Sequence, residues 1–495
     1  MKLGTIAGLI VFRTLNAILV QTSFVPDEYW QSLEVAHRMV FGVGHLTWEW
    51  TLAIRSAAMP ALFAPGFLAC SWLGCSVSCL RISVQILQII MAVWCDVSLF
   101  KLACRLFGRK SARYALLCQL LCWFHFYTCT RTLINTLEAV LLTASVANWP
   151  WPIAWPIVLD FGESVNVQLS CSSKLAISLA TLICYLRPSC AVFFITLACF
   201  SANFFQICKQ LVAFGAPVLL TVLVIDRIYF NDWVMPPWNF FHLNIVQNIA
   251  SLYGVHSAHW YFTVCLPATM LVWFPLSLYS ILTLQAWRSP VMISALVYLA
   301  ILSATPHKEL RFIQALLPIF FCYAGHCLET MPKRGTMLKC VLFVAVLLNI
   351  PVALYTSLVH QRGALDAISY LSQEIASFHP NASVLFLTPC HTLPLYSHLH
   401  ENVTTRFLRC ETIGALTVTA WEQDTFYQDP VQWVDTYALN ATRPSYILFF
   451  DSMEVILSPW LLRSGFMKAK EFFHTHFPEG RVGKYIVVYK TMPFL

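Results

Sequence analysis

Apolar residues along the chain gather in segments that are long enough to cross a membrane. A span needs about 20 residues, so the thirteen from Lys174 to Leu186 must be completed by flanking residues or by tilt. Residues 59–80 are apolar too, but Pro60 and Pro65 interrupt them, which predicts a re-entrant or interfacial segment. The eleven predicted spans are residues 4–24, 82–104, 113–130, 134–158, 174–186, 189–207, 210–229, 263–284, 290–304, 311–328 and 340–358.

Basic residues predict the orientation of these spans, because cytoplasmic loops carry an excess of Lys and Arg. They gather in four loops, near residues 101–113, 209, 288 and 333–339. With eleven spans, all four loops and the N-terminus are cytoplasmic, and everything after about Tyr355 is lumenal. The predicted domains are a transmembrane catalytic domain at 1–358, with lumenal loops 25–81 and 226–262, and a lumenal C-terminal domain at 359–495.

The C-terminal region agrees with this topology. Three glycosylation sequons begin at Asn381, Asn402 and Asn440, and glycans are added on the lumenal side. Strand-like runs alternate with helical stretches, which predicts a small α/β domain. Cys390 and Cys410 lie in this polar region, where they could pair or stay reduced. The strand-like runs are 384–387, 446–450 and 485–489.

Composition supports a polytopic α-helical membrane protein. The chain is 58% hydrophobic and 11% charged, which is more apolar surface than one or two soluble cores could bury. The net charge of +7 marks topology rather than a nucleic-acid partner. Most of the 19 cysteines lie inside apolar runs, where cysteine behaves as a small hydrophobe. Arg13 and Asn16 interrupt the first apolar segment, which favours an uncleaved signal anchor, and the sequence gives no partner for them.

Two adjacent acids, Asp27 and Glu28, follow the first predicted span and come directly after Pro26. Proline and acids are ordinary residues at the start of a helix. A carboxylate at the membrane surface can also act as a general base toward a hydroxyl group. Both interpretations can hold together, so Asp27 and Glu28 are the candidate catalytic residues.

Aromatic residues flank a third acid in the same loop, in Trp48-Glu49-Trp50. They are typical of a membrane interface, but they could also stack on a sugar while Glu49 binds its hydroxyls. Trp48, Glu49, Asp226 and His256 are the candidate sugar or acceptor contacts. His256 and His259 alone are a weak indication of metal, and no metal or cofactor is expected.

A basic cluster precedes the span at 311–328. His307, Lys308 and Arg311 crowd the start of a helix whose dipole is already positive there, which costs roughly 0.3 to 1 kcal/mol each unless an anion is bound. A phosphate would satisfy them, although the cluster could instead touch lipid headgroups. Arg187, in Tyr-Leu-Arg-Pro between two spans, could provide a second phosphate contact or snorkel to the interface.

A further polar set, Arg131, Asn135 and Glu138, lies on one face of a predicted membrane helix, and an interhelical network is its expected use. Taken together, a carboxylate, basic anchors and aromatic residues at one membrane face suit the transfer of a sugar from a lipid phosphate to a hydroxyl. The basic side chains would stabilise the leaving phosphate without a metal ion.

Several stretches resemble one family over nearly all of the chain. FVPDEYWQSLEVAHRMV with LTWEW, YLRPS, DRIYF and TPHKELRF are similar to the family 22 mannosyltransferases of GT-C fold, which use dolichyl phosphate mannose in the endoplasmic reticulum. The motif acid corresponds to Asp27, with Glu28 beside it, and the HKE motif to His307, Lys308 and Glu309. Several members have histidine where this chain has Val25, so the resemblance places no histidine beside the acids.

The resemblance is strongest to the members that add the third mannose, in α1,2 linkage and with inversion, to a GPI-anchor precursor in the lumen. The expected partners are therefore membrane lipids, dolichyl phosphate mannose and that precursor. Two alternatives stay open: a sibling that acts on the dolichol-linked N-glycan precursor or adds another GPI mannose, and a lipid transporter or scramblase. A transporter should carry charges at the bilayer midplane and internal repeats, whereas these clusters gather at one face.

Overall fold

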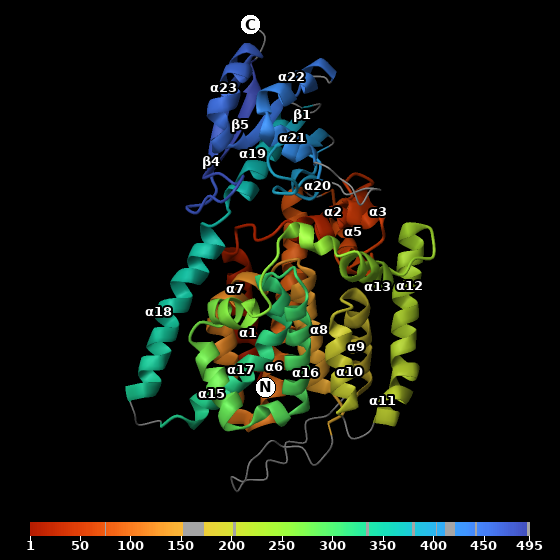
Figure 1. Ribbon diagram of the computed structural model, residues 1–495, viewed down its shortest axis with the longest axis vertical. Coiled ribbons are helices and arrows are strands. Elements are labelled where there is room, and N and C mark those ends of the chain that lie inside the picture. The colour runs from red at the N-terminus through yellow and green to blue at the C-terminus, as the bar shows by residue number, and fades with distance from the viewer. Residues whose placement is uncertain are drawn as a thin grey trace. The chain divides into compact units, whose positions relative to one another are not determined.

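The structure is a computed structural model, and it divides the chain into two compact units (Figure 1). The helical unit consists of Met1–Ile18, Ala53–Met59 and Val84–Ala353, and the mixed unit of Leu19–Leu52, Pro60–Ser83 and Leu354–Leu495. The last boundary along the chain, between Ala353 and Leu354, falls close to the predicted one at 358. Two segments of the first loop, Leu19–Leu52 and Pro60–Ser83, belong with the C-terminal region. The described residues are 1–74, 76–151, 173–200, 204–332, 336–378, 382–401, 403–410, 421–440 and 443–492.

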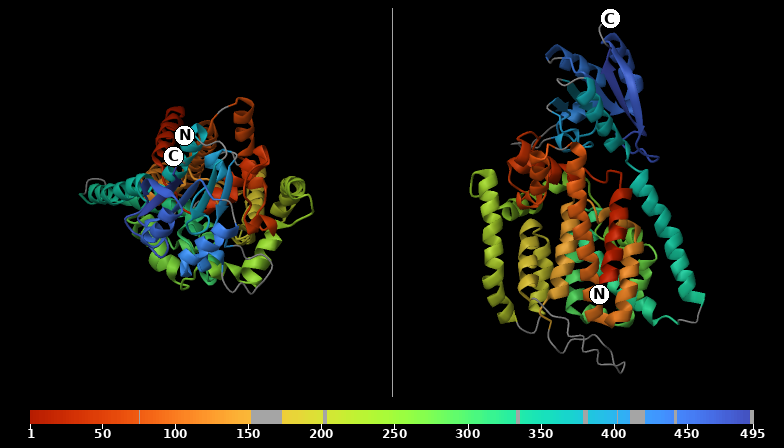
Figure 2. Two further views of the ribbon diagram at one scale, coloured as in Figure 1. Left: turned by 90° about the horizontal axis from the view of Figure 1, so that it is seen from above. Right: turned by 180° about the vertical axis from the view of Figure 1, so that it is seen from behind.

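In the helical unit the helices run side by side (Figures 1 and 2). A 3₁₀ segment, η7 (Leu310–Leu316), leads directly into α17. Three helices, α1, α6 and α18, begin or end inside the mixed unit. The helices are α1 (Leu3–Leu19), α4 (Ala58–Ala61), α6 (Val77–Leu121), α7 (Trp123–Thr128), α8 (Ile134–Asn148), α9 (Ser173–Leu186), α10 (Cys190–Cys199), α11 (Phe204–Gln210), α12 (Ala216–Phe230), α13 (Pro236–Phe241), α14 (Leu266–Met270), α15 (Trp273–Thr283), α16 (Pro290–Ala304), α17 (Leu317–Thr330) and α18 (Thr336–Leu358).

Within the described part of the chain, four helices are long and apolar enough to cross a membrane: Val77–Leu121, Phe204–Phe230, Leu310–Thr330 and Thr336–Ser377. A fifth span would result if Tyr261–Met270 and Trp273–Thr283, bent by 119° at their junction, were one broken span. Shorter apolar helices coincide with further predicted segments, among them α9 and α16. The chain is thus mostly helical, and the count of eleven spans stays a prediction.

Gly108 divides α6 into two helical arms. Its φ of 82° lies in the left-handed region, which glycine adopts without a steric penalty. The chain reverses there, so that Gln119 in the second arm donates a hydrogen bond of 2.7 Å to Asp96 in the first. This single 45-residue element therefore contains most of two segments that the hydrophobic pattern separates, 82–104 and 113–130.

The mixed unit is built on a five-stranded sheet of order β2-β1-β3-β5-β4. β1 runs parallel to β2 and to β3, whereas β5 is antiparallel to β3 and β4. The three strand-like runs of the sequence are confirmed as β1, β3 and β5. The strands are β1 (Ser383–Leu387), β2 (Thr404–Phe407), β3 (Tyr446–Phe450), β4 (Phe466–Phe473) and β5 (Tyr485–Thr491).

Helices cover the sheet because alternate residues of its central strands are apolar on both faces. One face, with Leu385, Ile447 and Val487, packs against α21, α22 and α23. The helix α19 contacts β4 and β5 and has a buried apolar stripe that includes Ile368 and Leu371. The helices of this unit are η1 (Tyr29–Leu33), α2 (Glu34–Phe41), α3 (Trp48–Thr51), α5 (Ala64–Trp72), α19 (Gly363–Phe378), α20 (Tyr396–Leu399), α21 (Glu422–Gln428), α22 (Pro430–Asn440) and α23 (Glu454–Arg463).

Candidate active site

The two candidate catalytic acids occupy different environments at the start of η1. The Glu28 side chain is buried, and its carboxylate accepts a 3.4 Å hydrogen bond from the Phe24 backbone N–H. It therefore serves the turn that begins the helix. Asp27 is half-buried. Glu28 thus fits the helix-start interpretation. Asp27 is the more accessible of the two carboxylates, and its catalytic role stays a prediction.

A segment from the C-terminal region packs against this helix. Trp30 donates its indole N–H to the Leu393 carbonyl at 3.1 Å, and its ring lies 4.5 Å from the ring of His391, centroid to centroid. Asp27 lies one helical turn before Trp30 and therefore on the same side of this helix. The neighbourhood of Asp27 is therefore built from both ends of the sequence.

Glu34 fixes the same segment, and the sequence reasoning missed it. Its fully buried carboxylate accepts hydrogen bonds from the backbone N–H groups of Leu395, Tyr396 and Ser397, at 2.9 to 3.1 Å, and from the Ser397 hydroxyl at 2.5 Å. Burial raises the pKa of Glu34, and these bonds oppose that shift. A lone acid between Leu33 and Val35 was the available signal.

Several histidines of the mixed unit are buried as neutral rings. Burial lowers the pKa of His37 to about 4, of His391 to about 4 and of His398 to about 3. His37 shares a 2.9 Å hydrogen bond with Nδ1 of His400, and its own Nδ1 bonds the Val43 carbonyl. Near neutral pH these rings therefore act as hydrogen-bonding groups rather than as cations.

The aromatic platform predicted for a sugar is absent from this structure. Trp48 and Trp50 are only 5% and 2% exposed, so neither ring offers a face for stacking. Trp50 instead donates its indole N–H to the Trp30 carbonyl at 3.3 Å. Both rings are buried because they carry a large apolar surface. This corrects the prediction that Trp48 contacts a sugar. Glu49 stays half-buried and accepts a 3.0 Å hydrogen bond from Gln31.

Two disulfide bonds cross-link the described residues of the mixed unit. Cys390 and Cys410 are joined, the pair that the sequence left open, and Cys70 and Cys79 are also joined. The second pair was missed because both cysteines lie in apolar stretches, where a free thiol is the ordinary expectation.

The sequons at Asn381 and Asn402 lie outside the described residues, as does the side chain of Asn440.

In the helical unit the predicted basic cluster carries its own counter-charge. Glu309 accepts two 2.7 Å hydrogen bonds from Arg311 and one of 3.0 Å from His307. Although burial opposes them, Arg311 and His307 hold the pKa of Glu309 well below its usual range. For His307, burial lowers the pKa, but the hydrogen bonds to Glu309 and to the Gly254 carbonyl outweigh it. The pKa of His307 is therefore above its ordinary value.

Lys308 is not placed to bind a phosphate, which corrects the prediction for this residue. Its side chain is buried, and its ammonium group donates to the backbone carbonyls of Thr305, at 2.5 Å, and His256, at 3.0 Å. The carbonyl of Pro306 lies a further 3.5 Å from the same nitrogen. Three donors thus meet three acceptors. The sequence analysis expected a bound anion to balance the positive charges at this helix start. In the structure, backbone carbonyls bind the Lys308 ammonium group and Glu309 balances Arg311.

Arg187 and Arg311 come together on one aromatic ring. Their guanidinium carbons lie 5.5 and 5.6 Å from the centre of the Phe312 ring. Arg187 also forms a 3.2 Å ion pair with Glu138. Two guanidinium groups at one place provide fork-shaped donors for a phosphate. Their role as phosphate contacts stays a prediction.

Glu138 is the centre of the interhelical network that the sequence predicted. Its buried carboxylate accepts 2.6 Å and 3.0 Å hydrogen bonds from Tyr298 of α16 and from Cys190 of α10, and a third, of 3.3 Å, from Asn135. Arg131, just before α8, donates its Nε to the Tyr127 carbonyl. The network joins α8 to α10 and α16, and it holds Arg187 in place.

Asp226 does not face a substrate. It is fully buried near the end of α12 and accepts hydrogen bonds from Tyr185 at 2.7 Å, from the Ala57 N–H at 2.7 Å and from Ser56 at 3.0 Å. This structural role corrects the prediction of sugar binding. His256, in contrast, is exposed and stacks on Trp260 with ring centroids 4.5 Å apart, which leaves its predicted acceptor role open.

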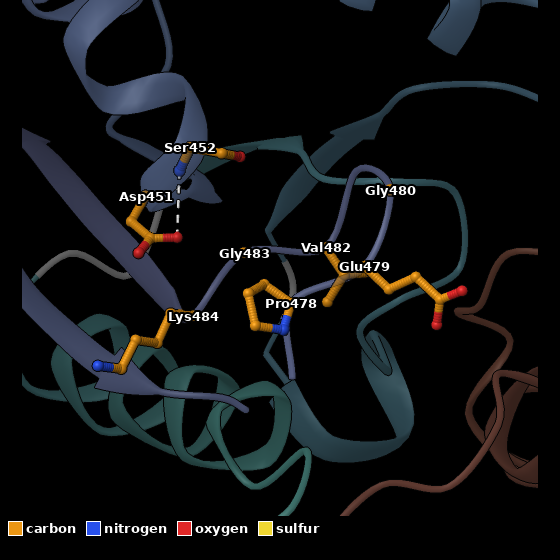
Figure 3. A pocket seen from close by; sticks show the side chains of 8 residues that line it. All are labelled: Asp451, Ser452, Pro478, Glu479, Gly480, Val482, Gly483 and Lys484. Carbon is orange, nitrogen blue, oxygen red and sulfur yellow. Dashed lines mark hydrogen bonds between the residues drawn. The ribbon is translucent and has the colours of Figure 1, made fainter. Parts of the chain in front are cut away.

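A shallow hollow lies beside the end of β3, where the loop of Pro478–Lys484 faces Asp451 and Ser452 (Figure 3). None of the sequence-predicted residues line it. Across the described residues, no group of three or more His, Cys, Asp or Glu side chains could hold a metal ion. The expectation that no metal takes part stays a prediction.

Solved structures with the same fold are membrane glycosyltransferases. ArnT from Cupriavidus metallidurans bound to undecaprenyl phosphate superposes with a TM-score of 0.61, at 11% identity, over 97% of this chain and 96% of its own. The Archaeoglobus fulgidus oligosaccharyltransferase superposes with a TM-score of 0.55, at 10% identity, over 91% and 70%. The fold is therefore that of the GT-C glycosyltransferases.

Sequence comparison gives the family. Residues 5–400 match the Alg9-like mannosyltransferase family. The GPI alpha-1,2-mannosyltransferase 3 of Danio rerio is 36% identical over 97% of this chain and 88% of its own length, and that of Homo sapiens is 36% identical over 97% and 86%. Mannosyltransferase APTG1 of Arabidopsis thaliana is 33% identical over 97% and 90%. The chain belongs to the Alg9-like mannosyltransferase family, and it is a mannosyltransferase.

Proposed function

We propose that this protein transfers mannose from dolichyl phosphate mannose to a GPI-anchor precursor in the lumen of the endoplasmic reticulum, forming the α1,2 linkage of the third mannose. One observation carries the proposal: relatives named GPI alpha-1,2-mannosyltransferase 3 match almost the whole chain at about 36% identity. Family membership disfavours the transporter alternative. The nature of the acceptor is what separates this proposal from a sibling enzyme of the N-glycan pathway.

The chemistry is a single displacement. The acceptor hydroxyl oxygen forms a bond to the anomeric carbon of mannose while the bond from that carbon to the phosphate oxygen breaks, which inverts the configuration. Asp27 takes the hydroxyl proton as general base. Dolichyl phosphate leaves with the bonding electrons, and Arg187 and Arg311 stabilise its charge.

The supporting residues are assigned from their contacts. Glu309 holds the Arg311 guanidinium through two hydrogen bonds, and His307 holds Glu309 from the other side. Arg187 is held by Glu138. An arginine that is already fixed loses less side-chain entropy when it binds a phosphate. Each basic group thus has a residue that orients it.

The experiment combines a lipid profile with variants of the two acids. Cells that lack the protein should accumulate a GPI intermediate with two mannoses, and truncated dolichol oligosaccharides would instead show the sibling activity. In complemented cells, Asp27→Asn should lower mannose transfer by about 10² to 10⁴-fold. Glu28→Gln is the matched control and should retain most activity, because Glu28 serves the helix start. Full activity of Asp27→Asn at normal protein level would refute the base assignment.

A further inference from the structure

His391 lies in the turn that follows β1, shortly after this strand ends at Leu387. The turn that carries it follows β1, where the Thr392 N–H and hydroxyl both bond the Pro389 carbonyl, at 3.2 and 2.6 Å. In α/β sheets with parallel strands, ligand sites gather beyond the carboxyl ends of the strands. His391 itself has a φ of 63°, a left-handed conformation that few residues other than glycine adopt.

The turn is held from several sides, which keeps His391 in this conformation. Cys390 is tied to Cys410 by a disulfide, and its backbone N–H donates to Gln423 at 3.2 Å. Downstream, the Leu393 carbonyl accepts the Trp30 indole N–H. Backbone strain of this kind persists where surrounding contacts impose it, and it is often found at functional sites.

The His391 ring has one nitrogen without a partner. Nδ1 lies 3.8 Å from Sγ of Cys410, and a disulfide sulfur has no proton to give, so the contact fits an N–H at Nδ1. Nε2 is then a bare acceptor. It is buried, and no described residue lies within hydrogen-bonding distance of it. A buried acceptor without a donor is costly, which makes it a place where a donor is expected during function.

Asp27 is the group that can supply the donor. It lies three residues before Trp30 at the start of the same helix, and the Trp30 ring is 4.5 Å from the His391 ring, so Asp27 is on the side of the helix that carries this contact. An ionised carboxylate has no proton to share with a bare nitrogen, but a carboxylic acid has one. We propose that His391 is a positioning residue for the catalytic base, and that its Nε2 accepts a hydrogen bond from the carboxylic acid that Asp27 becomes when it takes the acceptor proton.

The proton balance is complete within the transfer step. The O–H bond of the acceptor breaks, its proton moves to a carboxylate oxygen of Asp27, and the new acid O–H points at Nε2 of His391. The proton leaves to solvent before the next cycle. Because this hydrogen bond exists only after the proton has moved, it stabilises the transition state more than the bound substrates. This inference rests on the proposed function.

The test uses the full-length protein in microsomes, with dolichyl phosphate mannose and a two-mannose GPI glycolipid as substrates. His391→Phe keeps a ring against Trp30 but removes the nitrogen, and it should lower kcat about tenfold while both KM values stay unchanged. His391→Gln places an amide near the position of Nε2 and should restore most of kcat. His391→Asn, which tolerates the left-handed backbone but does not reach that position, should behave like the phenylalanine variant.

Two controls separate positioning from folding. His398→Phe changes a nearby histidine of the same segment whose Nδ1 bonds Ser397 at 2.9 Å, and it should leave kcat unchanged. In an Asp27→Asn background, His391→Phe should cause no further loss of the residual rate, because the acid it serves is gone. Wild-type kcat in both His391→Phe and His391→Asn, or additive losses in the double variant, would overturn the inference alone. Absence of mannose transfer by the wild-type protein would overturn the proposed function with it.

Discussion

Asp96 of the helical unit and Glu34 of the mixed unit are both fully buried carboxylates, but different kinds of partner hold them. In the helical unit, charge meets charge: Arg13 and Asp96 are both fully buried and joined at 2.7 and 2.8 Å, and Arg187 meets Glu138. In the mixed unit, Glu34 is held by three backbone N–H groups and a hydroxyl. The histidines there stay neutral.

This difference follows from what each unit can offer. Inside a helix the backbone donors are already bonded to the same helix, so the Asp96 carboxylate is held by side chains, chiefly the Arg13 guanidinium. The start of the short helix α20 leaves N–H groups unpaired, and these can receive a carboxylate. Removing Asp96 leaves a buried cation, so it should cost more than removing Glu34, which leaves neutral donors.

The largest effect is expected at Asp96. Replacing it by leucine leaves the Arg13 guanidinium buried without its counter-ion, which typically costs about 3 to 5 kcal/mol. Arg13 keeps only Asn16 and Cys129 as partners, both at 3.1 Å. The thermal unfolding midpoint in detergent, followed by tryptophan fluorescence, should fall strongly.

The control is the double variant Arg13→Met with Asp96→Leu, which removes both charges and keeps similar volume. It should recover most of the lost stability, since a buried pair often gives little net stabilisation. If the single and double variants unfold at the same temperature, the ion pair is not what the buried arginine depends on.

A smaller effect is expected at Glu34. Glu34→Leu leaves four donors without an acceptor and should cost about 2 to 3 kcal/mol. Glu34→Gln still accepts through its carbonyl oxygen, so its cost should be about 1 kcal/mol. Hydrogen exchange of peptides that cover 393–399 measures this locally. The matched control, Glu49→Gln, alters a half-buried acid and should leave this exchange unchanged; equal exchange in Glu34→Leu would contradict the proposed role.

The neutral histidines predict a pH dependence of the mixed unit. The folded pKa of His37 and of His391 is about 4 and that of His398 about 3, against an ordinary value of 6.5. Below 6.5 the unfolded chain therefore binds more protons, so stability falls as the pH falls, by roughly 1 kcal/mol per pH unit for each histidine.

Hydrogen exchange of peptides that cover 389–400, corrected for its intrinsic pH dependence, should thus show weaker protection at pH about 5 than at about 7. In His398→Gln the difference should become smaller, because one titrating ring is gone. Equal protection at the two pH values would show that these rings are not buried as neutral groups.

The sequence predicted features that depend on residue type and period. Alternating and continuous apolar runs predicted β1, β3 and β5. Asn135 and Glu138 of the predicted polar set do form an interhelical network, whereas Arg131, the first residue of the i, i+4, i+7 pattern, precedes α8. The partners of individual charges were harder to predict. Lys308 looks like a phosphate ligand in sequence, but carbonyls of residues 305 and 256 bind it. Backbone acceptors are the same at every residue, so no sequence pattern reveals which of them a lysine will reach.

Other differences between prediction and structure arise because residues far apart in the sequence contact each other in the fold. Arg13 finds Asp96 and Trp30 finds Leu393, 83 and 363 residues away along the chain. Trp48 was predicted to be accessible because tryptophan often lies at membrane interfaces, yet its large apolar surface is buried instead. Which of several allowed environments an aromatic residue enters is decided by packing, and packing is not local in the sequence.

The smallest effect is expected at an exposed pair of the mixed unit, which tests whether burial causes the contrast between the units. Arg362 and Asp366 form a 3.0 Å ion pair one helical turn apart, with side chains 42% and 41% exposed. Water screens such a pair and fixing its side chains costs entropy, so Asp366→Ala should change stability by no more than about 0.5 kcal/mol. The same fluorescence midpoint used for Asp96→Leu measures it, and added salt should reduce even this effect. A loss comparable to that of Asp96→Leu would show that pairing itself, rather than removal from water, makes these charges important.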